Sequence, residues 1–201
     1  MAMGAVLTQA VAWRNVEMAL ARLKAHGLWE PEAIVEAPPG LLEASLRPTR
    51  YFSSKAQRLR GLAQLVLAYG RPGRQGLARL LALSAPSLRQ ALLSVRGIGP
   101  ETADDILLYG AGHPVFVVDR YTHRIFLRIG FWPDPRYRYH AIQRAVERAL
   151  PPDVVQYQEF HALLVRLGKE VCRPTPRCGM CPLADGCRHA AGEAAGRRGG
   201  V

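Results

Sequence analysis

The sequence predicts an all-α protein, and three features of the chain support that prediction. Apolar residues recur every three or four positions through most of the 201 residues, which is the spacing of a buried helix face. No segment alternates convincingly between apolar and polar residues, as a half-buried strand would. Glycines and prolines separate the helical segments at close intervals, so the connections are expected to be short.

In the first half of the chain, five segments have the apolar periodicity of helices. The first spans residues 5–24 and ends near Gly27. Pro31 suits the first turn of the second segment, 31–37, and Pro38-Pro39 is expected to stop it. The remaining three segments are 53–69, 76–83 and 86–94, and Gly70 closes the first of these three.

Helical periodicity returns after a short glycine-rich turn at residues 95–99. It covers residues 100–110, 120–131, 140–150 and 154–172. The apolar run 114–118, "PVFVV", is either a short strand or a buried approach to the next helix, and five residues do not distinguish the two. Residues 189–201 are rich in glycine and other small residues, so we expect a flexible tail there.

The chain is strongly basic. Its 27 lysine and arginine residues exceed its 16 aspartate and glutamate residues by 11. Such a surplus favours a polyanionic partner, although a solubilising basic surface explains the same composition. No apolar run approaches the roughly 20 residues of a membrane helix, and the amino end lacks the basic segment of a signal peptide. We therefore expect no membrane association and a cytoplasmic location.

All four cysteines fall within one short stretch. Cys172, Cys178, Cys181 and Cys187 follow the pattern C-x5-C-x2-C-x5-C. Four thiolates this close in sequence can enclose a tetrahedral zinc ion or an iron–sulfur cluster, and the spacing alone does not choose between them. The clustering is typical of metal ligands rather than of a disulfide framework spread over a secreted domain.

The stretch "SVRGIGPETADDIL" places a tight turn between two helices. Gly97 and Gly99 permit positive φ and let the backbone approach a ligand closely. Together with Ile98 they present N–H groups beside a helix start, where an anion such as a DNA phosphate is favoured. Pro100 suits the first helical turn and Thr102 can cap it. A plain helix-loop-helix corner explains the same glycines.

These segments together resemble the endonuclease III superfamily of helix-hairpin-helix DNA glycosylases. "SVRGIGPETADDIL" matches the hairpin and "FVVDRYTHRI" matches the acid that follows it, while "GAVLTQAVAWRNVEMAL", "YFSSKAQRLRGLA" and "EFHALLVRLGKEVC" match further segments. The resemblance implies a two-lobed all-α fold. A helical barrel would cover residues 1–114, with the hairpin at about 87–110, and residues 115–188 would form the lobe with the catalytic acid and the iron–sulfur cluster.

The resemblance also implies roles for individual residues. Asp119 would stabilise the positive charge that develops on the sugar during base removal, and orient or deprotonate a water molecule. A role as N-cap of the next helix explains the same aspartate, and both roles are compatible. Contacts to DNA are expected from the hairpin residues Gly97, Ile98, Gly99 and Thr102, from Gln9 in the gap left by an extruded base, and from Lys55, Arg173 and Arg177.

For the four cysteines, the resemblance implies a [4Fe-4S] cluster, with structural zinc as the alternative. The first gap is one residue shorter than the family's most familiar spacing. The cluster would fix the loop Arg173–Arg177 so that its arginines reach the DNA backbone, although a solvated loop explains these arginines as well.

One departure from the family pattern concerns the mechanism. Bifunctional members carry a lysine two residues after the second hairpin glycine, and its amine attacks the sugar to form a Schiff base. Glu101 occupies this position here. A carboxylate cannot form an imine, so we expect a monofunctional glycosylase with water as the nucleophile. Lys55 or Lys169 could supply a weak lyase activity.

Glu101, "LTQAVAW" and "KAQRLRGLA" make the chain more similar to the branch that includes a 3-methyladenine glycosylase, so an alkylated base is the expected substrate. The expected partner is double-stranded DNA containing damaged bases, bound by a monomer that in a prokaryote is associated with the nucleoid. Tyr51, Trp13 and Trp132 are candidates for stacking on an extruded base, although such aromatic residues are more often part of a core. The alternatives are a bifunctional glycosylase and lyase for oxidised pyrimidines, and a non-catalytic module that binds lesions.

Overall fold

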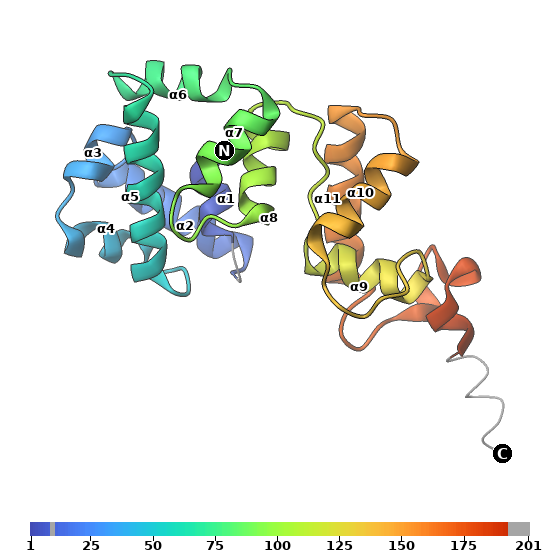
Figure 1. Cartoon of the computed structure of the whole chain (residues 1–201). Helices are drawn as coiled ribbons and strands as arrows, with labels where there is room; N and C mark the ends of the chain where they lie inside the picture. Colours follow the sequence, from blue (N-terminus) through green and yellow to red (C-terminus); the bar gives the residue numbers. More distant parts are fainter. Residues whose placement is uncertain (9–10, 193–201) are drawn as a thin grey trace. The chain divides into compact units, whose positions relative to one another are not determined.

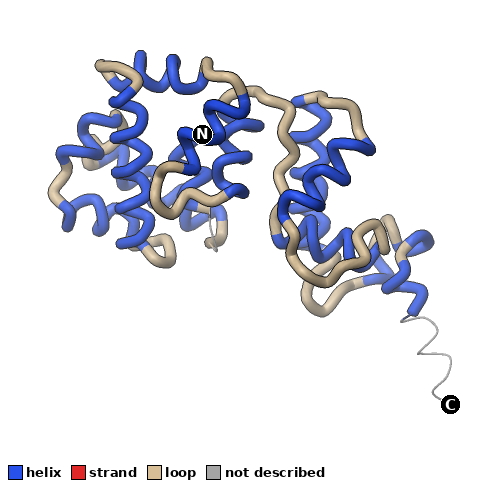
Figure 2. Tube along the Cα trace, in the orientation of Figure 1, coloured by secondary structure: helices blue, strands red, loops and turns tan. Residues whose placement is uncertain are grey.

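The structure is a computed structural model that describes residues 1–8 and 11–192 (Figure 1). Helices, turns and loops make up this part of the chain, and no strand occurs within it (Figure 2). The prediction of an all-α fold is therefore confirmed. Two compact units make up the chain: unit 1 is Met1–His113 and unit 2 is Pro114–Val201. None of the described helices is long and apolar enough to cross a membrane.

Unit 1 is built around one central helix. Its elements are α1 (Ala2–Leu7), α2 (Trp13–Ala25), α3 (Pro31–Glu36), α4 (Pro39–Leu46), α5 (Phe52–Ala68), α6 (Gly73–Leu81), α7 (Ala85–Leu93), α8 (Pro100–Asp105) and the π-helical turn η1 (Ile106–Gly110). Helix α5 packs against α1, α3, α4, α6 and α7. The face of α5 that the sequence predicts to be apolar is buried at Leu59, Leu62 and Val66.

The single helix expected over residues 5–24 is in fact two helices, α1 and α2, so this prediction was wrong. The Thr8 hydroxyl donates to the carbonyl of Ala5 at 3.0 Å, and Ala12 is extended, with φ −66° and ψ 141°. The two helices bury their apolar faces against different neighbours, α1 against α5, α8 and η1, and α2 against α4. The apolar periodicity of the sequence therefore continues although the helix is interrupted between α1 and α2.

Helix α4 was also missed, because Pro38-Pro39 was expected only to end a helix. Pro38 is the N-cap of α4 and Pro39 is its first residue. Proline suits this position because the first N–H groups of a helix have no partner within the helix, and the ring fixes φ near the helical value. Leu42 and Leu46 are buried and anchor the helix.

The labelled elements of unit 2 are three α-helices and two 3-10 turns. They are α9 (Arg120–Ile129), α10 (Tyr139–Ala149), α11 (Val154–Glu170) and the 3-10 turns η2 (Cys178–Met180) and η3 (Ala184–Gly186). Helix α9 packs against α11, where a Cβ on Gly168 would lie only 2.5 Å from Cδ1 of Tyr121. Residues 188–192 are helical, so the expected tail, 189–201, begins as a helix, and residues 193–201 lie outside the described residues.

The apolar run 114–118 is not a strand but a buried approach to α9. Phe116, Val117 and Val118 are fully buried. Side chains supply the hydrogen bonds that a sheet would otherwise give: Gln143 donates to the Phe116 carbonyl at 2.7 Å, and Glu147 accepts from the Phe116 N–H at 3.0 Å. This buried segment leads directly into Asp119, the residue before α9.

Candidate functional site

A hairpin in unit 1 joins α7 to α8. Ile98 is buried, and its N–H donates to the Val95 carbonyl at 3.0 Å, which closes the turn. Gly97 is exposed and has φ +88°, a left-handed conformation that favours glycine. Gly99 is the N-cap of α8, and it has no side chain that could accept a hydrogen bond from the first turn. The hairpin therefore presents backbone at a helix start, as an anion site requires.

The two helices of the hairpin are held together by an ion pair. Arg89 of α7 donates two hydrogen bonds to Asp104 of α8, at 2.7 and 3.2 Å, and the Asp104 side chain is fully buried. Removing one partner of such a buried pair typically costs about 3–5 kcal/mol. The sequence suggested that Thr102 caps α8, but it does not. Gly99 is the N-cap, and Thr102 is the buried third residue of the helix.

Asp119 of unit 2 is the N-cap of α9. Its Oδ1 accepts from the Thr122 N–H at 2.7 Å and from the Thr122 hydroxyl at 2.8 Å. The side chain is 13% exposed, so the carboxylate lies just below the surface. The capping role expected from the sequence is confirmed. Two hydrogen bonds to one oxygen fix the orientation of the carboxylate and leave its other oxygen, Oδ2, outside the cap.

His161 of α11 lies beside that second oxygen and was missed by the sequence analysis. Its Nε2 is 3.9 Å from Asp119 Oδ2, and its side chain is only 12% exposed. Burial lowers the pKa of His161, and the negative charge of Asp119 partly opposes this shift. His161 is 42 positions from Asp119 in a segment with an ordinary helical pattern, so only the packing of α9 on α11 reveals the pair.

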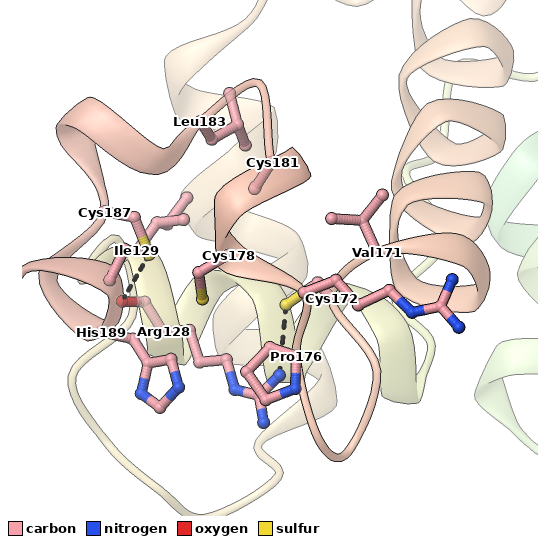
Figure 3. Close-up of a pocket in the computed structure, with 12 residues that line it drawn as sticks. Arg128, Ile129, Val171, Cys172, Pro176, Cys178, Cys181, Leu183, Cys187 and His189 are labelled. Atoms are coloured by element: carbon pink, nitrogen blue, oxygen red, sulfur yellow. Dashed lines mark hydrogen bonds between the residues drawn. The ribbon is translucent and has the colours of Figure 1, made fainter. Parts of the chain in front are cut away.

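The four cysteines line one pocket at the end of α9 (Figure 3). Cys172 follows α11, Cys178 begins η2, Cys181 follows η2 and Cys187 follows η3. Arg128 of α9 contacts two of them: its Nη1 donates to Cys172 Sγ at 3.3 Å, and its carbonyl accepts from Cys187 Sγ at 3.5 Å. Within the described residues, no three His, Cys, Asp or Glu side chains are arranged to hold a single metal ion.

Comparison with known proteins identifies the family. A family model for HhH-GPD superfamily base excision DNA repair proteins matches residues 3–152, which includes the hairpin and Asp119. The chain belongs to this superfamily.

Individual HhH-GPD relatives cover most of the chain. A provisionally named DNA repair glycosylase of Methanocaldococcus jannaschii is 37% identical over 92% of this chain and 82% of the relative. Endonuclease III of Thermotoga maritima is 28% identical over 90% of this chain and 78% of its own length.

Two solved structures have the same fold. A trapped covalent intermediate of endonuclease III with DNA superimposes with a TM-score of 0.80 at 21% identity, over 96% of this chain and 84% of that one. The Helicobacter pylori 3-methyladenine DNA glycosylase bound to 1,N6-ethenoadenine has a TM-score of 0.72 at 25% identity, over 84% and 83% of the two chains. The likeness to the first structure concerns the fold alone.

The remaining residues predicted for this HhH-GPD site lie in varied surroundings. Arg173 and Arg177 are exposed on the cysteine loop, as a contact with DNA requires. Lys55 differs from the expectation: it is 1% exposed, and its Nζ donates to the Leu7 carbonyl at 2.9 Å. Because this ammonium caps the end of α1 inside unit 1, it is not placed to contact DNA or to attack a sugar. Gln9 lies outside the described residues.

Among the three aromatic candidates for base stacking, Tyr51 is the most accessible. It is 71% exposed, against 51% for Trp13, whereas Trp132 is half-buried. Tyr51 precedes α5 and has φ 56°, a left-handed conformation that is unusual for a residue with a Cβ. Such strain on an exposed aromatic residue is typical of positions kept for binding.

Proposed function

We propose that this HhH-GPD protein is a monofunctional DNA glycosylase that extrudes an alkylated base from double-stranded DNA and hydrolyses its N-glycosidic bond. The observation that carries the proposal is the setting of Asp119. Its carboxylate is fixed through Oδ1 by Thr122, whereas Oδ2 faces the buried His161. An oriented carboxylate beside the sugar stabilises the positive charge that develops as the base leaves, and it positions a water molecule for attack.

The choice of hydrolysis over lyase chemistry depends on Glu101. This residue lies in the first turn of α8, at the place where bifunctional family members have their Schiff-base lysine. Its negative charge interacts favourably with the positive end of the helix dipole, but a carboxylate cannot form an imine. Lys55, which could have replaced the missing amine, is buried against Leu7.

An alkylated base fits this chemistry. Alkylated purines such as 3-methyladenine already carry positive charge and leave readily, so selective capture matters more than a strong acid. The likeness to a 3-methyladenine DNA glycosylase structure supports this substrate class. The likeness to endonuclease III supports the alternative, a bifunctional enzyme for oxidised pyrimidines.

Each unit by itself offers backbone or basic groups that suit DNA phosphates. In unit 1, the exposed Gly97 and the helix start at Gly99 suit a phosphate. In unit 2, Arg173 and Arg177 suit further phosphates, and each such contact adds about 0.9 to the slope of log affinity against log salt. Tyr51 is the proposed stacking residue.

We further propose that the cysteine pocket holds a [4Fe-4S] cluster, with zinc as the alternative. The donor set fits, because four thiols line one pocket and the Arg128 guanidinium donates a hydrogen bond to Cys172 Sγ. The bound cluster would supply a structural cross-link between the cysteine loop and α9. Visible absorbance together with about four irons per chain would support the cluster, and one tightly bound zinc without absorbance would contradict it.

A matched pair of variants tests the role of Asp119. The N-cap of α11, Asp153, accepts from the Gln156 N–H at 2.7 Å, just as Asp119 accepts from Thr122, but it is exposed and has no proposed chemistry. Asp119→Asn is expected to lower single-turnover release of the base by roughly 10²–10⁴-fold and to leave DNA binding intact. Asp153→Asn is expected to change neither quantity. Unaltered release by Asp119→Asn would contradict the assignment and leave a lesion-binding module as the better explanation.

A further inference from the structure

A second pocket of unit 1 lies between the central helix α5 and the hairpin. From α5 it is lined by Ser54, Gln57 and Arg58, and from the end of α7 and the turn by Ser94, Arg96 and Gly97. Further along α5, Arg60 and Gln64 continue the same wall. The pocket therefore shares Gly97 with the proposed phosphate site of the hairpin.

Two glycines allow α5 and the hairpin, which line this pocket, to pack closely against each other. A Cβ on Gly97 would lie 2.6 Å from Nε of Arg58, so the Arg58 side chain lies directly against the bare backbone of the turn. On α5, a Cβ on Gly61 would lie 2.9 Å from Cγ1 of Val95. A larger residue at position 61 would force Val95 and α5 apart, and one at position 97 would displace the Arg58 side chain from the turn.

The pocket is lined by basic and polar side chains. The residues that line it include Arg58, Arg60 and Arg96 and no acidic residue. Arg60 is partly occupied, since its Nη2 donates to the Ala37 carbonyl at 2.6 Å, but a carbonyl does not neutralise a guanidinium. Burial, together with the nearby charge of Arg58, lowers the pKa of Lys55 to about 8. A concave surface of this kind attracts a polyanion.

We propose that this pocket binds the sugar–phosphate backbone of DNA next to the hairpin, and that Arg58 contacts the phosphate that neighbours the one held at Gly97. This inference rests on the proposed function, because it takes DNA as the partner. A guanidinium such as that of Arg58 forms charge-assisted hydrogen bonds with phosphate, and the polar side chains of Ser54 and Gln57 offer further donors to the same strand. DNA would then follow α5 away from the hairpin rather than touch the turn alone.

The salt dependence of binding to labelled duplex DNA tests this inference. Arg58→Gln removes one charge and is expected to lower the slope of log affinity against log salt by about 0.9, while Arg58→Lys keeps the charge and the slope. Arg22→Gln is the control, because Arg22 is an exposed arginine of α2 that does not line the pocket. It is expected to leave the slope unchanged. Thermal unfolding of each variant verifies that unit 1 remains folded.

The outcomes separate this inference from the function on which it rests. A wild-type slope for Arg58→Gln would overturn the phosphate contact while leaving the glycosylase proposal intact. Equal losses of affinity in Arg58→Gln and Arg58→Lys would also overturn it, since they would show that Arg58 only packs against Gly97. If the wild-type protein does not bind duplex DNA in a salt-dependent manner, the proposed function itself fails.

Discussion

Helix α8 begins at Gly99, which has no side chain, whereas helix α9 begins at Asp119, whose carboxylate accepts from the first turn of its own helix. Both helix starts have a positive dipole end and first-turn N–H groups that find no partner within the helix. In α8 the N-cap has no side chain to accept from these groups, and we propose that a DNA phosphate binds there. In α9 they are used internally and fix a carboxylate in one orientation. In the proposed function, the residue at the cap thus distinguishes a helix start that binds DNA from one that orients a catalytic carboxylate.

The first way to break this comparison is to place an amine at the start of α8. Glu101→Lys is expected to introduce lyase activity, seen as strand breaks without alkali and as a covalent complex trapped by borohydride. The change also reverses a favourable charge at the dipole, at a cost of about 0.3–1 kcal/mol. Glu101→Gln, which has no amine, is the control and should form no trapped complex. Equal trapping by Glu101→Gln and Glu101→Lys would show that position 101 does not decide the chemistry.

The next effect concerns Lys55, the buried cation near the hairpin side of α5. The pKa of Lys55 is about 8 in the fold and about 10.4 in the unfolded chain. Between these values the unfolded chain binds a proton that the folded chain does not, so the free energy of unfolding rises with pH, by about 3 kcal/mol in total. Chemical denaturation of the wild type and Lys55→Met at pH 7.5 and 10.5 measures the difference. Parallel pH profiles would contradict the shift.

The third effect concerns the bare backbone of the turn itself. Gly97→Ala introduces a Cβ at positive φ that would lie 2.6 Å from Arg58 Nε, whereas Gly112→Ala has a similar φ of +70° with nothing within 4 Å. Both variants should lose roughly 1–2 kcal/mol of stability from backbone strain. Only Gly97→Ala should also weaken binding to DNA, about tenfold or more. Equal DNA affinities in fluorescence anisotropy would show that the turn is merely a corner.

The smallest effect is expected at His161, beside the capped carboxylate of α9. Because burial lowers the pKa of His161, the unfolded chain takes up a proton below about pH 6.5 that the folded chain resists. The free energy of unfolding should therefore fall as the pH drops below that value. His161→Gln should lose less stability on acidification, as measured by denaturation at pH 5 and 7. A steeper loss in the variant than in the wild type would contradict this interpretation.

What the sequence predicted was largely local. The hairpin at Gly97 and Gly99, the cap at Asp119 and the cysteine spacing are short patterns whose chemistry depends on neighbouring residues. The sequence did not reveal features that depend on which element packs against which. The break between α1 and α2 falls within continuous apolar periodicity, and Lys55 resembles a surface cation until α1 is seen to end against it. The contacts of His161 with Asp119 and of Arg58 with Gly97 join segments far apart in the chain.

The most direct test of the proposed chemistry uses the wild-type protein. End-labelled duplexes that carry methylated purines or oxidised pyrimidines would be incubated with it and separated on a gel with and without hot alkali. We expect breaks in the methylated duplexes that appear only after alkali, because Asp119 assists hydrolysis and Glu101 supplies no amine. Breaks without alkali, together with a complex trapped by borohydride, would show that an amine of this chain attacks the sugar and would contradict the monofunctional mechanism.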